Sequence, residues 1–169
     1  MSTKVDAPIS VDEYLRTSYS PDCEYVDGAI VERNVGDWLH GMTQGNIVFA
    51  LRRKYPNIKA VPELRVRTIP GRRFRIPDVT VVLEAPETEI LETAPFIAME
   101  ILSKDDRMSA ILEKLEEYHR AGAPNIWVFD RRRKKAFTFD GRRLVEVEGK
   151  EIVTEAPEIR LALDEVFQK

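Results

Sequence analysis

The stretch FIAMEIL at residues 96–102 decides the fold. It is apolar at every position except Glu100, so both of its alternating faces are apolar. This pattern is typical of a central strand that is covered on both sides by other elements. An unpaired carboxylate in such a strand costs on the order of several kcal/mol. Glu100 is therefore expected to have a cationic partner, a proton or a metal ion.

The segments around this strand alternate between helical and extended patterns. Upstream, the sequence predicts a short helix over 10–17, a hairpin turning at Asp27-Gly28, a helix over 37–55, and extended segments over 60–68 and 74–83. Downstream, it predicts an irregular acidic stretch over 84–95, a helix over 105–121 capped by Gly122, a buried strand over 125–130, strands over 135–139, 143–147 and 151–154, and a short helix over 163–167. The expected class is α/β (α+β), a mixed β-sheet flanked by helices with N-terminal and C-terminal β-hairpins.

Length and composition indicate a single domain over residues 1–169. The lone Cys23 allows no internal disulfide, and with two scattered histidines it makes no zinc cluster. No apolar run is suited to a signal peptide or a membrane span, so a cytoplasmic protein is expected. The net charge of −3 argues against dominant non-specific DNA binding but permits a local basic cleft.

A second acid accompanies Glu100. Asp78 follows Pro77 at the start of a valine-rich segment. Two carboxylates at the ends of neighbouring strands can converge on one divalent cation, and Mg²⁺ (or Mn²⁺) needs few protein ligands beyond waters. The backbone carbonyl of Ile101 is a third candidate ligand, and a nearby lysine would stabilise developing negative charge. Taken singly, Asp78 also fits a turn or cap aspartate, and Glu100 a buried ion pair.

An ordered set of motifs resembles the Uma family of restriction endonucleases, within the PD-(D/E)xK nucleases. The matching residues are EYVDGAIV at 24–31, His40, RIPDV at 75–79, EILS at 100–103, Asp106-Arg107, Lys114, Tyr118, Gly122 and IWVFD at 126–130. The resemblance implies a restriction-endonuclease-like core, Asp78 and Glu100 as metal ligands, and DNA hydrolysis as the reaction.

One position departs from the motif. Lysine is expected two residues after the second acid, where this chain has Leu102. The resemblance transfers the lysine role to Lys114, which shares a helix face with Tyr118. Lys104 is the rival, since it has the strand parity of Glu100.

Other polar residues are weaker candidates. The resemblance places His40 near the site, as a candidate contact for a water or phosphate, and Gln44 lies one helical turn from it. Glu24 and Glu32 are candidates for an additional acid, with hairpin-surface carboxylates as the alternative. His119 is expected on the solvent side of its helix.

Two basic clusters flank these motifs. Arg65, Arg67, Arg72, Arg73 and Arg75 lead into Asp78 and are either a phosphate-tracking stripe or solvated charges. The run at 131–135 is expected to be a solvated turn.

Three functions remain open from sequence. The first is a Mg²⁺-dependent phosphodiesterase acting on DNA, and the second is a non-catalytic binding or oligomerisation module on the same fold. The third is a hydrolase of another phosphorylated substrate. Phosphate-loop and serine-hydrolase motifs are absent from the sequence. By analogy with nucleases that cut two strands, a homodimer is expected.

Overall fold

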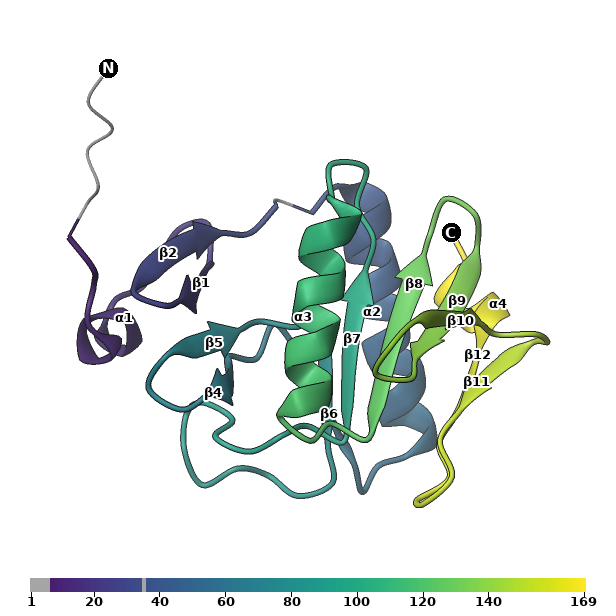
Figure 1. The fold of residues 1–169 in the computed structure, drawn as a ribbon. Helices are drawn as coiled ribbons and strands as arrows, with labels where there is room; N and C mark the ends of the chain where they lie inside the picture. The colour runs from purple at the N-terminus through teal and green to yellow at the C-terminus, as the bar shows by residue number, and fades with distance from the viewer. Residues whose placement is uncertain (1–6, 35) are drawn as a thin grey trace.

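A computed structural model describes residues 7–34 and 36–169 of the chain (Figure 1). The N-terminal stretch that was expected to lack a signal-peptide core begins with residues 1–6, which lie outside the described residues. Across the described part, no helix has the length and apolar character needed to cross a membrane.

A six-stranded mixed sheet forms the centre of the molecule, in the order β10-β9-β8-β7-β6-β3. Its strands are β3 Lys59–Pro62, β6 Val79–Val82, β7 Ile97–Ile101, β8 Asn125–Asp130, β9 Lys135–Phe139 and β10 Leu144–Glu146. β7 and β8 are parallel, and all other neighbours in this sheet are antiparallel. The predicted central strand at FIAMEIL is therefore confirmed, and the expected mixed sheet with it.

Two helices cover opposite faces of this sheet (Figure 1): α2 Trp38–Lys54 and α3 Met108–Arg120. Alternate residues of β7 divide between the two cores. Ile97, Met99 and Ile101 pack with α2, and Ala98 packs with α3. Because strand side chains alternate with period two, Glu100 shares the α3 face with Ala98.

A second, antiparallel sheet has the order β2-β1-β5-β4. It contains β1 Cys23–Val26, β2 Ala29–Glu32, β4 Val66–Ile69 and β5 Arg73–Arg75, and α1 Val11–Arg16 packs against it. Tyr14 of α1 joins Tyr25 and Phe74 in a small aromatic core. The predicted N-terminal helix and the Asp27-Gly28 hairpin are both confirmed.

The extended segments predicted over 60–68 and 74–83 each divide into two strands of different sheets. β3 and β6 belong to the main sheet, whereas β4 and β5 belong to the second sheet. Glu63 has a left-handed φ of 52°, which ends β3, and Pro77 stands between β5 and β6 without a backbone donor. The two interruptions make the chain change sheets beside Asp78.

Smaller differences occur towards the C-terminus. α3 begins at Met108 rather than at 105, because the Asp106 carboxylate accepts from the Ser103 N–H and holds a preceding loop. Strand β12 Arg160–Ala162, which the sequence reading missed, pairs with β11 Glu151–Val153. The predicted closing helix is confirmed as α4 Leu163–Val166.

Candidate active site

The register of β6 and β7 brings the two predicted acids together. Val79 pairs with Met99 and Thr80 with Ala98, so Asp78 and Glu100 stand opposite one another one step beyond the last paired residues. Both side chains are buried, each 4% exposed. Asp78 directly precedes β6 and Glu100 lies near the end of β7, so the two acids meet where these neighbouring antiparallel strands begin and end.

Three groups hold the Asp78 carboxylate. Arg33 Nη2 lies 2.9 Å and His40 Nε2 3.2 Å from its Oδ1, while the Ile101 N–H donates to Oδ2 over 2.7 Å. Gln44 of α2 donates to the Asp78 backbone carbonyl over 2.8 Å. His40 and Gln44 therefore reach the same residue from the same helix face.

The Glu100 carboxylate meets α3. Tyr118 donates its hydroxyl proton to Oε1 over 2.6 Å, and Lys114 Nζ lies 3.7 Å from Oε2. The single helical turn between Lys114 and Tyr118 brings both side chains to this carboxylate. The motif expects a lysine two residues after Glu100, where this chain has Leu102. In the structure, Lys114 of α3 lies beside Glu100.

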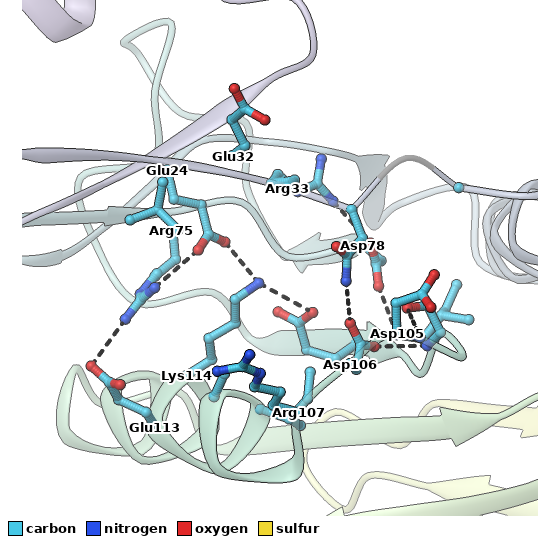
Figure 2. Close-up of a pocket in the computed structure, with 18 of the residues that line it drawn as sticks. Glu24, Glu32, Arg33, Arg75, Asp78, Asp105, Asp106, Arg107, Glu113 and Lys114 are labelled. Atoms are coloured by element: carbon cyan, nitrogen blue, oxygen red, sulfur yellow. Dashed lines mark hydrogen bonds and ion pairs between the residues drawn. The ribbon is translucent and has the colours of Figure 1, made fainter. Parts of the chain in front are cut away.

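Glu24 of β1 completes the group as a third buried acid, 1% exposed. Its Oε1 lies 2.9 Å from Lys114 Nζ and accepts from the Ile76 N–H, and its Oε2 accepts from Arg75 over 3.0 Å. Figure 2 shows Lys114 extending from α3 toward Glu24, with Arg75 between Glu24 and Glu113. Glu24 therefore fixes the position of the Lys114 ammonium.

These side chains line one cavity of about 590 Å³. Its walls include Glu24, Asp78, Glu100, Lys114 and His40, and its rim includes Arg33, Asp105, Asp106 and Arg107. Ile101 also lines it. The Ile101 N–H faces Asp78 whereas the next N–H, of Leu102, bonds Phe129 on the other side, so the Ile101 carbonyl faces the Asp78 side as well.

Burial and charge shift the pKa values of the two acids in opposite directions. Burial raises the pKa of Glu100 to about 7; Lys114 opposes this rise, and the negative charges of Asp78 and Glu24 add to it. Burial also acts to raise the pKa of Asp78, but hydrogen bonding and charge from His40, the Ile101 N–H and Arg33 outweigh it and lower that pKa. Asp78 therefore favours its ionised form, whereas the positive charge near Glu100 does not offset the effect of its burial.

The pKa values of the two neighbouring basic side chains, His40 and Lys114, are raised. The hydrogen bond to Asp78 raises the pKa of His40 against the opposing effect of burial. Burial acts to lower the pKa of Lys114, but Glu100 and Glu24 outweigh it and raise that pKa. Proton donors therefore face both acids.

The comparisons with known proteins agree with this geometry. The model of the Uma2 family, described as "Putative restriction endonuclease", matches residues 11–164. The chain belongs to this family. Its fold resembles the crystal structure of a putative nuclease belonging to DUF820 from Anabaena variabilis ATCC 29413, with a TM-score of 0.78. The two share 22% sequence identity, over 95% of this chain and 98% of that one. No curated protein matches.

Uma2 membership confirms the resemblance inferred from the sequence motifs, and it supports a nuclease function in general terms. The structural likeness confirms the fold. The remaining candidate residues separate clearly by position. Lys104 is exposed and does not line the cavity, Glu32 is exposed on its rim, and His119 is exposed on α3 as expected.

The arginines before Asp78 are not a free phosphate-tracking stripe. Arg75 is 5% exposed and pairs with Glu24 and Glu117. Arg73 pairs with Asp27, Glu113 and Glu117. Arg72 also pairs with Asp27, Arg67 with Glu92, and Arg65 lies over the Tyr14 ring. Acids of the chain itself therefore neutralise most of this cluster.

The basic run at 131–135 differs from the expected solvated turn at its first residue, Arg131. Arg131 is buried, pairs with Asp37 and donates to the Leu102 carbonyl, so it ties the start of α2 to the end of β7. The other residues of the run are exposed, as expected for a solvated turn.

Sequence reasoning missed Arg33 and Glu117. Arg33 bridges Asp78 and Glu63, and Glu117 bridges Arg73 and Arg75. Glu117 carried one usable signal, because it lies three residues from Lys114 on the inward face of the helix. Arg33, at the end of a short exposed strand, carried none.

Proposed function

We propose that this protein is a divalent-metal-dependent endodeoxyribonuclease that hydrolyses phosphodiester bonds of DNA. One observation carries the proposal. Three buried carboxylates and a partly buried lysine converge on one open cavity at the edge of a restriction-endonuclease-like sheet. Buried acids with opposed pKa shifts in a cavity are typical of functional sites.

The residues present fit a magnesium ion. No group of three or more acidic, histidine or cysteine side chains forms a metal cage among the described residues. Mg²⁺ needs no such cage, since it keeps several waters and takes one or two carboxylates. In our proposal Asp78, Glu100 and the Ile101 carbonyl hold Mg²⁺ or Mn²⁺. The raised pKa of Glu100 supports this, because a divalent cation supplies the positive charge that this carboxylate lacks.

The bound cation would polarise the phosphodiester and lower the pKa of an attacking water. The side chains of the chain have separate tasks. Lys114, fixed by Glu24, presents its ammonium to the place where negative charge develops on the phosphate. His40 is a positioning residue, because its Nε2 faces Asp78. Tyr118 orients Glu100 through its hydroxyl.

The first experiment is thermal unfolding with and without millimolar Mg²⁺ or Mn²⁺, followed by a DNA cleavage assay. A ligand that binds only the folded state raises the melting temperature. We expect a metal-induced rise and metal-dependent cleavage in the wild type. Both should disappear in Asp78→Asn and Glu100→Gln, which preserve side-chain size. Glu32→Gln, on the exposed rim of the same cavity, is the matched control and should keep both.

The alternative is a non-catalytic module on the nuclease fold. The observation that favours it is that protein groups already pair with both Asp78 carboxylate oxygens. It predicts unchanged melting temperatures with metal and no cleavage by the wild type. If the Asp78→Asn variant instead cuts DNA as well as the wild type does, the active site lies elsewhere in the protein.

A further inference from the structure

Helix α2 lies on one side of the main sheet (Figure 1), and it carries exposed apolar residues besides those that it buries in the core. Its inner residues Ile47 and Leu51 are fully buried in the main core. On the outer side, Trp38 is 78% exposed and Phe49 62%. A helix that is apolar on both sides is typically covered on both sides. Within the described residues, only the inner side of α2 is covered.

A groove of about 700 Å³ runs along this outer face. Pro62 of β3 lines it together with seven residues of α2: Gly41, Gln44, Gly45, Val48, Phe49, Arg52 and Arg53. An apolar groove next to protruding aromatic rings is typical of a surface that packs against another protein.

The two glycines leave open space beside α2 in the described part of the chain. A Cβ added at Gly41 or Gly45 would meet no atom within 4 Å. Glycine is also the poorest helix former after proline, so both residues weaken α2. Their benefit is that they lower the helix surface and let a second backbone approach closely.

We propose that this face binds a second copy of the chain, with the two α2 helices packed antiparallel and crossing at Gly45. In a two-fold interface, if residue i faces residue j, then j faces i. Centring the axis on Gly45 places Phe49 opposite Gly41 of the second copy, because the two are four residues either side of position 45. It likewise places Trp38 opposite Arg52 of the second copy, seven residues either side.

This register is complementary in size and in charge. The Phe49 ring meets the notch left by Gly41, a large group against the smallest. Arg52 forms no ion pair within the described residues, and the Trp38 ring gives its guanidinium a cation–π partner. Antiparallel packing also opposes the helix dipoles and separates the basic ends, Arg52 to Lys54, of the two helices.

A nucleic-acid strand is the competing occupant, since α2 contains no acidic residue. The observations favour a protein. Beside Gln44, Arg52 and Arg53, the groove is lined by glycine, valine, phenylalanine and proline, and Arg53 and Lys54 are already engaged with Glu165 and with the Tyr55 ring. The interface does not depend on the proposed nuclease activity. If that activity holds, the same helix carries His40 and Gln44, so the dimer would set two sites in fixed relation.

The test is the molar mass in solution, measured by light scattering and sedimentation. We expect the wild type to have the mass of two chains at micromolar concentrations. Phe49→Asp and Gly41→Leu should weaken self-association at least about tenfold. A Cβ at position 41 meets no described atom within 4 Å, so the circular dichroism and melting curve of Gly41→Leu should remain those of a folded protein. Val153→Asp, at an exposed apolar residue of β11, is the control and should stay dimeric.

Cysteine cross-linking tests the register itself. Gly45→Cys should form an intermolecular disulfide on mild oxidation. Glu116→Cys, at an exposed residue of α3, should not. The native Cys23 is buried and should not compete in the cross-linking. A monomeric wild type, or a Gly41→Leu variant that keeps the mass of two chains, would overturn the proposal. If the wild type is monomeric and the α2 variants weaken DNA binding, the face is a nucleic-acid surface and the proposal is likewise wrong.

Discussion

Lys114 reaches Glu100 from a helix, and the motif position on the strand is taken by Leu102. We expect Lys114→Met to lower the rate of DNA cleavage by about 100-fold or more, because it removes the ammonium beside the developing charge. Lys104→Met, at an exposed position outside the cavity, should cleave at the wild-type rate. Single-turnover cleavage of both variants checks this. A loss in Lys104→Met with full activity in Lys114→Met would transfer the role to Lys104.

Arg75 is a structural cation rather than a DNA contact. Its removal leaves the buried Glu24 and Glu117 short of a partner. We predict that Arg75→Gln lowers the free energy of unfolding by about 3–5 kcal/mol. Arg132→Gln, at an exposed residue, should change it little. Denaturant unfolding measures both, and a stable Arg75→Gln variant with impaired DNA binding would restore the phosphate-tracking interpretation.

At the residue scale, sequence reasoning succeeded where the local setting was anomalous. Glu100 stood out because a charge in an apolar strand needs a partner, and Asp78 because a neighbouring strand carried a second acid. Arg33 and Glu117 escaped because their partners are distant in sequence, 45 residues from Arg33 to Asp78 and 42 from Glu117 to Arg75. Only the tertiary fold brings such pairs together.

At the element scale, periodicity located the helices and the central strand but not the change of sheet. A run of extended residues looks the same whether it stays in one sheet or crosses to another. Glu63 and Pro77 mark the crossings, and only Pro77 has a backbone preference readable from sequence. This change of sheet matters for the site. Arg33, which directly follows β2 of the second sheet, lies beside Asp78, which directly precedes β6 of the main sheet.

The first helix offers a test of element stability. Ser10 caps α1 by accepting from the Glu13 N–H over 3.1 Å. We expect Ser10→Ala to lower the free energy of unfolding by about 1 kcal/mol, because a helix N–H loses its acceptor. Ser109→Ala, at an exposed residue of α3, removes no cap and should be neutral or slightly stabilising. Equal effects of the two substitutions in denaturant unfolding would show that the cap contributes nothing.

At the scale of the whole molecule, charge pairing explains how a chain of net charge −3 buries so many ions. Arginines that appeared in sequence as a basic stripe turn inward and meet Glu117, Glu24 and Asp27 where the second sheet contacts α3. This network joins the second sheet to α3 beside the candidate site. The protein's resistance to acid should therefore depend on the ionisation of its buried members.

Glu117 makes that dependence measurable. Burial acts to raise its pKa, but Arg75 and Arg73 outweigh it and hold the pKa below the ordinary value of 4.5. An acid whose pKa is lowered by folding stabilises the native state above its unfolded pKa, and this stability is lost as the pH falls through the folded pKa. We expect the free energy of unfolding to decline as the pH falls below about 4.5, where the unfolded chain takes up the proton first. Glu117→Gln should be less stable at pH 7 and show a shallower decline, measured by denaturant unfolding between pH 7 and 3. An equally steep decline in Glu117→Gln would mean that other carboxylates control the acid sensitivity, and that the ion pairs of Glu117 do not stabilise the contact between α3 and the second sheet.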